Sequence, residues 1–162
     1  MAGRPTRFET ARQLSIAVAI TMATSAAWGL VDGGLYKDNA LVTAGWRGND
    51  LITLAAVTPL LLTALSAARR GSLRGQLLWL GTLDYALYNS AFYLFGSAFN
   101  AAFLLYVATF TFAIFALVFG LAAVDADSLR QRLSPRLPRR TVAGVLVVIA
   151  LALGGFHVGV AL

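Results

Sequence analysis

The strongest constraint on the fold of this chain is its division into long apolar runs separated by short connections. The apolar runs cover residues 14–34, 50–68, 76–95, 98–122 and 141–162. Each has roughly the 20 residues that an α-helix needs to cross a bilayer. Within lipid the backbone must satisfy its own hydrogen bonds, and a helix does so. The sequence therefore predicts an all-α integral membrane protein, folded as one bundle of five transmembrane helices.

The composition favours a membrane protein over a soluble one. Hydrophobic residues make up 59% of the 162 residues and charged residues only 12%, whereas soluble domains carry about 25% charged residues. The connections leave no room for a separate soluble domain, so we expect a single domain. The bias toward Ala, Arg and Leu, with one lysine, is typical of a high-GC bacterial genome. We therefore predict a multi-pass protein of the inner (plasma) membrane.

The basic residues predict the orientation of the helices. Of the 13 Lys and Arg residues, three precede the first run, three lie between the second and third, and five lie between the fourth and fifth. Only Lys37 and Arg47 remain on the other side. Connections rich in Lys and Arg stay on the cytoplasmic side. We expect the N-terminus inside, the C-terminus outside, and contact between the basic connection 124–140 and anionic lipids.

The first two runs carry features that bear on processing and packing. The sequence ATSAA follows a basic start and an apolar core, as in a cleaved signal peptide, but the apolar run continues past it and favours a retained helix. Gly29 and Gly33 form a G-x-x-x-G pattern that lets another helix approach closely. Pro59 lies near the centre of the second run, where it predicts a kink that serves packing.

The third run is the most informative for function, because it carries Asp84 among tyrosines and an asparagine. A carboxylate at the centre of a transmembrane helix costs about 3 kcal/mol on insertion scales, and such groups usually face the bundle interior beside a partner. The Gly96–Ser97 turn predicts an antiparallel hairpin with the fourth run, with Ser97 capping the next helix. A rise of about 1.5 Å per residue then places Asp84 level with Thr109, and Thr21 of the first run near the same depth.

These positions predict a polar site on the third span. The candidate ligand-binding or proton-active residues are Asp84, Tyr85, Tyr88, Asn89, Tyr93, Asn100 and Thr109. Asp84, Tyr88 and Thr109 would share a buried hydrogen-bond network, and Asn89 and Tyr93 would extend it outward. The alternative is that the tyrosines pack with a bonded tip and that Asn89 joins helices.

A second candidate region is the outer connection, residues 35–49. We expect Asp38 to cap a short helical turn and Asp50 to cap the start of the second span. A capping loop on the lipid headgroups is the favoured interpretation, because surface loops are generically polar. A binding lid is the alternative, with Asp38, Trp46, Arg47 and Asp50 as its candidate residues.

The residue inventory excludes several kinds of site. The chain has no cysteine, which excludes disulfides and thiolate metal sites. His157 is the only histidine, so one chain cannot supply two histidine ligands to zinc or haem; we interpret it as packed or solvated. No catalytic motif is present, and we predict no catalytic residues, no metal and no cofactor. Nucleic-acid binding is not expected, because the arginines form no reading motif.

Three functions fit these observations. The first is a small-molecule or proton-coupled carrier or channel subunit, favoured by Asp84 among aromatic and hydroxyl side chains. The second is a non-catalytic membrane scaffold or accessory subunit of a larger complex, favoured by the G-x-x-x-G patterns and the lack of catalytic motifs. An enzyme or sensor for a lipid or quinone is the least favoured. We expect membrane lipids as partners, together with a second copy of the chain or another membrane subunit.

Overall fold

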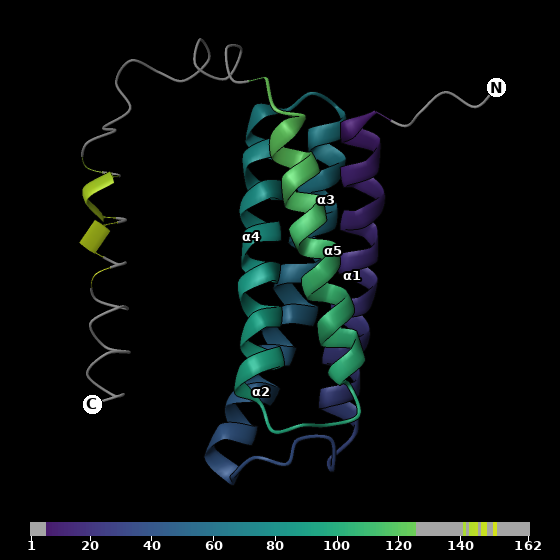
Figure 1. Cartoon of the computed structure of the whole chain (residues 1–162), viewed down its shortest axis with the longest axis vertical. Coiled ribbons are helices and arrows are strands. Elements are labelled where there is room, and N and C mark those ends of the chain that lie inside the picture. Colours follow the sequence, from purple (N-terminus) through teal and green to yellow (C-terminus); the bar gives the residue numbers. More distant parts are fainter. Residues whose placement is uncertain (1–5, 126–140, 142, 146, 149–150, 152–162) are drawn as a thin grey trace, which may run out of the picture. The chain divides into compact units, whose positions relative to one another are not determined.

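The described part of the chain is helical (Figure 1). The computed structural model describes residues 6–125, 141, 143–145, 147–148 and 151. Residues up to Val124 form one compact unit. Its helices are α1 (Arg7–Val31), α2 (Ala40–Ile52), the π-helix η1 (Thr53–Val57), α3 (Thr58–Arg69), α4 (Leu73–Gly96) and α5 (Phe103–Ala122). No strand occurs in the described ranges, which agrees with the all-α prediction.

The second unit begins at Asp125. Its described residues between 141 and 151 are helical. Most of the predicted fifth span, nearly all of the basic connection 124–140, and His157 lie outside the described residues.

Three helical stretches are long and apolar enough to cross a membrane. They are α1, the continuous stretch Ala40–Arg69 that contains α2, η1 and α3, and α5. With 24 residues, α4 is also long. Large apolar side chains such as Ile20, Leu104 and Leu121 are exposed on the outside of the unit, as lipid-facing residues are. The chain is therefore a helical membrane protein.

The outer connection is mostly helical, contrary to the prediction for residues 35–49. The α2 helix begins at Ala40, and the cap is Asn39, whose side chain accepts a hydrogen bond from the Val42 N–H at 3.0 Å. The predictions that Asp38 caps this segment and that Asp50 opens the second span were wrong. Asp50 lies inside a continuous helix, nearly three turns after its start at Ala40. Its side chain therefore does not cap the helix and can make other contacts.

The α4–α5 connection also differs from the prediction. Ser97 is the C-terminal cap of α4 rather than the N-terminal cap of α5. Its hydroxyl donates to the Tyr93 carbonyl at 2.7 Å. The next helix begins only at Phe103, after a turn that Asn100 organises. The two helices still run antiparallel, as Figure 1 shows.

The helix is perturbed just before Pro59, and the perturbation is a π-helix; the kink expected at Pro59 stays a prediction. Proline lacks a backbone N–H and crowds the preceding turn. The helix widens over Thr53–Val57, directly before Pro59, and continues as α3. Such π-helical turns insert one extra residue and often lie at functional sites. This one begins three residues after Asp50.

Close packing at the end of the unit opposite α2 depends on a tryptophan and two glycines. Trp79 is fully buried and donates from its indole nitrogen to the Ser15 hydroxyl at 2.9 Å, which joins α4 to α1. A Cβ at Gly120 would lie 3.2 Å from the Trp79 ring. A Cβ at Gly75 would lie 2.6 Å from the Ala67 side chain, so α4 and α3 touch there almost backbone to backbone.

We therefore predict that Gly75→Ala lowers the free energy of unfolding by about 1–3 kcal/mol, because α3 and α4 must separate. Gly81→Ala on the same helix is the matched control, since a Cβ there meets open space. It should be neutral or stabilise by up to about 1 kcal/mol through helix propensity. Thermal unfolding in detergent measures both, and equal stability of the two variants would contradict the packing described.

Candidate functional site

Asp50 is the centre of a buried polar cluster at the end of the unit where the α1–α2 and α4–α5 connections lie. Only 3% of Asp50 is exposed. Its Oδ2 accepts a hydrogen bond from the Tyr36 hydroxyl at 2.6 Å, and its Oδ1 accepts one from the Tyr93 hydroxyl at 2.8 Å. Among the described residues the one salt bridge joins Arg12 to Glu9, so no cationic side chain pairs with Asp50.

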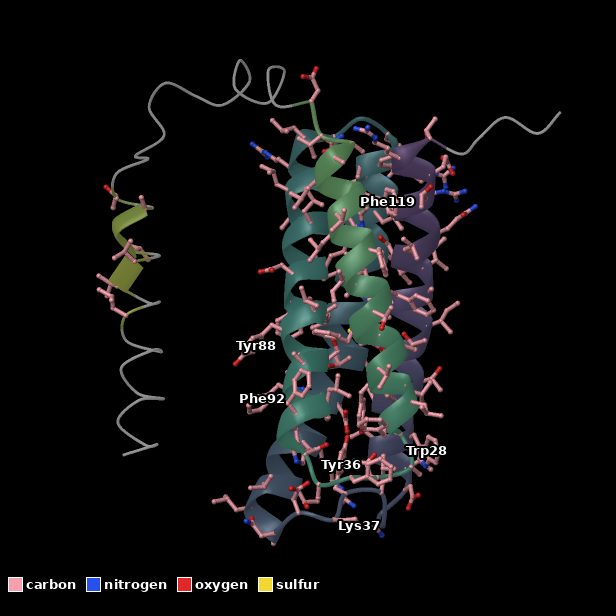
Figure 2. All side chains as sticks on the ribbon, in the orientation of Figure 1. Trp28, Tyr36, Lys37, Tyr88, Phe92 and Phe119 are labelled. Carbon is pink, nitrogen blue, oxygen red and sulfur yellow. The ribbon has the colours of Figure 1, made fainter. Side chains whose placement is uncertain are left out.

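Tyr36 reaches Asp50 from the connection between α1 and α2 (Figure 2). Burial raises the pKa of the Tyr36 hydroxyl above its ordinary value, and the hydrogen bond to Asp50 raises it further. Tyr36 therefore keeps its proton and donates a hydrogen bond to Asp50. Gly29 in α1 makes room for the pair, because a Cβ at that position would overlap the Asp50 carboxylate and the Tyr36 hydroxyl.

Two asparagines and a third tyrosine extend the cluster between α2 and α4. The Asn49 side-chain amide donates to Asn89 Oδ1 at 2.7 Å and to the Tyr93 hydroxyl at 3.0 Å. Its Oδ1 accepts from the Tyr85 hydroxyl at 3.1 Å. Asn49 thus uses both ends of its amide, and α2 is tied to α4 at three points. We call Asp50, Tyr36, Tyr93, Asn49, Asn89 and Tyr85 the Asp50 cluster.

Aromatic rings enclose the Asp50 cluster. Tyr93 packs against Trp46, with ring centroids 4.7 Å apart, and stacks on Tyr106 at 5.0 Å. Tyr36 lies 6.3 Å from Tyr93. All four rings are buried. They exclude solvent from Asp50, and a low local dielectric strengthens its hydrogen bonds.

Asp38 closes the same end of the unit. One of its carboxylate oxygens accepts from the Trp46 indole at 3.1 Å, and both accept from the Ala98 N–H at 3.2 and 3.3 Å. Asp38 therefore fastens α2 to the α4–α5 connection. Arg47 donates to the Gly33 carbonyl at 3.2 Å and fastens α2 to the end of α1. Asp38 and Arg47 thus hold α2 in place beside the cluster.

A small cavity and an open groove adjoin the cluster. The cavity is small, about 10 Å³, and residues of α1, α2, η1, α4 and α5 line it, Asp50, Thr53 and Tyr106 among them. The groove, of about 400 Å³, lies between α2 and α4, with Trp46 and Asn49 among its lining residues. Asn89 lines both the small cavity and the larger groove, so the polar cluster borders the two.

The structure places the residues predicted from the third span on two different faces of α4. Tyr85, Asn89 and Tyr93 enter the Asp50 cluster. Asp84, expected to face the interior, is exposed on the described unit, and no hydrogen bond to it is found within residues 6–125. Tyr88 is 64% exposed and points outward (Figure 2). The buried face of α4 follows other positions, Leu83 among them, and Asp84 stands about 100° around the helix from Leu83.

The two polar candidates of the fourth span have different surroundings. Thr109 donates to the Thr21 hydroxyl at 2.8 Å, at the depth expected from register, and lines the small cavity. The sequence had predicted that Thr109 shares a hydrogen-bond network with Asp84 and Tyr88. Within the described residues it does not. Asn100 accepts from the Ala102 N–H at 3.0 Å and donates to the Ala98 carbonyl at 3.1 Å. Asn100 therefore shapes the turn before α5.

Sequence reasoning named four residues of the Asp50 cluster but missed Tyr36 and Asn49, as well as the adjoining Thr53 and Tyr106. Tyr36 and Asn49 both lie in the segment 35–49, which was predicted to be a polar connection on the lipid headgroups. The signal that would have found Asn49 is the pair Asn49–Asp50 followed by Pro59, since a polar pair before a helix perturbation is typical of a functional span. Tyr36 carries no comparable signal.

Comparison of the chain with models of protein families, with curated proteins and with solved structures finds no match. The residues of the Asp50 cluster are therefore interpreted from their geometry.

We predict that Gly29→Ala disrupts the Asp50 cluster, because its Cβ would occupy the place of the Asp50–Tyr36 hydrogen bond. The free energy of unfolding should fall by about 1–3 kcal/mol, and near-ultraviolet circular dichroism should report loosened packing of the Tyr36 and Trp46 rings. Gly33→Ala is the matched control, since the nearest atom to its Cβ is the Arg47 guanidinium at 3.6 Å. Equal spectra and stability for the two variants would argue against the arrangement.

Proposed function

We propose that the protein is a small-molecule or proton-coupled carrier, or a channel subunit, of the bacterial inner membrane, and that Asp50 is its proton-active group. The proposed architecture has five spans with the N-terminus inside and the C-terminus outside. Support for it comes from the three membrane-compatible stretches, the long α4 and the apolar run at 141–162. The Arg7 guanidinium contacts the Ala122 carbonyl at 3.5 Å, so the N-terminus of α1 and the C-terminus of α5 share one basic end.

Labelling of single cysteines tests this orientation, and the chain has no native cysteine to interfere. Lys37 and Arg70 are both exposed and lie in connections at opposite ends of the unit. We expect a membrane-impermeant maleimide to label Lys37→Cys in spheroplasts. It should label Arg70→Cys only after permeabilisation, because the Arg-rich end is expected to face the cytoplasm. The reverse pattern would overturn the orientation.

The observation that carries the proposal is the position of the Tyr93 hydroxyl between two acceptors. It lies 2.8 Å from Asp50 Oδ1 and 3.1 Å from the Trp46 carbonyl oxygen. When Asp50 is ionised, Tyr93 donates to the carboxylate. When Asp50 binds a proton on Oδ1, that O–H donates to the Tyr93 oxygen, and the Tyr93 hydroxyl turns to the Trp46 carbonyl. Both states of Asp50 are thus satisfied without movement of heavy atoms.

The charge balance around Asp50 also supports proton exchange. Burying a carboxylate without a counter-charge is costly. The titratable and charged groups around it are Tyr36 from the connection, Tyr93 from α4, Tyr106 from α5 and Arg47 from α2; the tyrosines are neutral donors and Arg47 is held by Gly33. A proton that binds and leaves with each cycle removes the cost, which is how intramembrane carboxylates act in transporters.

The alternative function, a non-catalytic scaffold or accessory subunit, is favoured by one observation. Tyr88, Phe92 and Phe95 lie on one face of α4 and are 64%, 52% and 76% exposed. Figure 2 shows Tyr88 and Phe92 projecting from the helix. Such a face suits lipid, a second copy or another membrane subunit. Recovery of a stable monomer without partners from the native membrane would count against this alternative.

Proton flux into liposomes that enclose a pH-sensitive dye tests the carrier proposal. We expect Asp50→Asn to reduce the protein-dependent flux to the background of protein-free liposomes, because the amide cannot exchange a proton. Asp84→Asn is the matched control: it removes the same group from the exposed face of α4 and should leave the flux unchanged. Equal flux in wild type and Asp50→Asn, or no protein-dependent flux in the wild type, would refute the proposal.

A further inference from the structure

The small cavity beside Asp50 has the chemistry of an ion site. It is small, about 10 Å³, and its lining residues come from α1, α2, η1, α4 and α5. A buried space of about this size holds a single small guest, provided that polar partners surround it. Most of its lining residues carry a side-chain oxygen: Ser25, Asp50, Thr53, Asn89, Ser90, Tyr93, Tyr106 and Thr109.

Several hydroxyls of the cavity can offer only lone pairs to a guest. Ser90 donates its proton to the Ala86 carbonyl at 2.7 Å, and Ser25 donates to the Met22 carbonyl at 3.0 Å. The one proton of Thr109 has two acceptors in reach, the Leu105 carbonyl at 2.7 Å and the Thr21 hydroxyl at 2.8 Å. A hydroxyl has one proton and two acceptor lone pairs. With their protons committed to these acceptors, the three side chains present lone pairs toward the cavity, as the ionised Asp50 carboxylate does.

One further hydroxyl at the cavity has no partner. Thr53 is 2% exposed, and its Oγ1 forms no hydrogen bond within the described residues. An unpartnered buried polar atom costs about 1–3 kcal/mol. Thr53 is the first residue of the π-helix, so the widened turn brings this hydroxyl to the cavity.

We propose that this cavity binds one monovalent alkali cation, of the size of Na⁺, with Asp50 as its charged ligand and Thr53 as a neutral one. Oxygen ligands suit hard cations, and ion sites in transporters lie at helix interruptions of this kind. One carboxylate balances one positive charge, and no group of three or more acidic or histidine side chains that would hold a divalent ion occurs among the described residues. The small size of the cavity favours Na⁺ over the larger K⁺.

Cation and proton compete for the same carboxylate under this inference. The inference rests on the Asp50 site of the proposed function, but it concerns binding and does not require transport. A bound cation balances the buried charge when Asp50 is ionised, and a proton balances it otherwise. Exchange of one for the other moves no net charge into the cluster.

Thermal unfolding of the purified protein in detergent, followed by tryptophan fluorescence, tests the inference. At a constant ionic strength made up with choline chloride, we expect Na⁺ to raise the unfolding temperature by about 3 °C at saturating concentrations. K⁺ should have a smaller effect. The Na⁺ effect should vanish in Thr53→Val, which keeps the shape of the side chain, and in Asp50→Asn.

Thr63→Val in α3 is the matched control, because the Thr63 hydroxyl is exposed and donates to the Pro59 carbonyl at 2.8 Å, away from the cavity. It should keep the full Na⁺ effect. In choline alone, Thr53→Val should unfold no earlier than wild type, because the unpartnered hydroxyl is gone; this keeps the test valid even where Asp50→Asn folds poorly.

Equal effects of Na⁺ and choline on the wild type, or a full Na⁺ effect in Thr53→Val, would overturn the cation site and mean that the cavity holds only water. These outcomes are separate from those of the flux assay: an Asp50-dependent proton flux without Na⁺ binding would retain the carrier and reject the cation, and the reverse result would retain the cation site alone.

Discussion

The structure depends on one arrangement, a buried carboxylate held by two tyrosine hydroxyls. Asp50 accepts from Tyr36 at 2.6 Å and from Tyr93 at 2.8 Å, and no basic side chain pairs with it in the described part of the chain. These contacts join α2, α4 and the α1–α2 connection at one end of the unit. A buried carboxylate with too few hydrogen bonds would destabilise the fold. The surrounding segments must therefore place hydrogen-bond donors beside Asp50.

Other features of the chain serve this arrangement. Gly29 leaves the space that the Asp50–Tyr36 hydrogen bond occupies, which gives the G-x-x-x-G pattern a role in the site beyond helix packing. The π-helix ahead of Pro59 places Thr53 beside the small cavity. Asp38 joins α2 to the α4–α5 connection at the same end, through Trp46 and Ala98. The opposite end, where Trp79 bonds to Ser15, is a conventional packed core.

The helical architecture was predictable, because long apolar runs in a bilayer leave a chain few other choices. Tyr85, Asn89 and Tyr93 were also predicted as site residues, because polar side chains in a span stand out against an apolar background. Asp84 was expected to face the interior but is exposed, because register gives depth along a helix and not direction around it. Asp50 was taken for a cap because the helical start at Asn39 was missed. The contact of Tyr36 with Asp50 arises from tertiary folding of a connection, which local sequence patterns do not encode.

The central claim is that Asp50, and not Asp84, is the buried group that exchanges a proton. Infrared difference spectroscopy in lipid, recorded between two pH values, tests it most directly, because a carboxyl C=O band reports protonation of Asp and Glu side chains. The account predicts a pH-dependent carboxyl band that persists in Asp84→Asn and disappears in Asp50→Asn. A band that persists in Asp50→Asn and disappears in Asp84→Asn would contradict it and return the site to the outer face of α4.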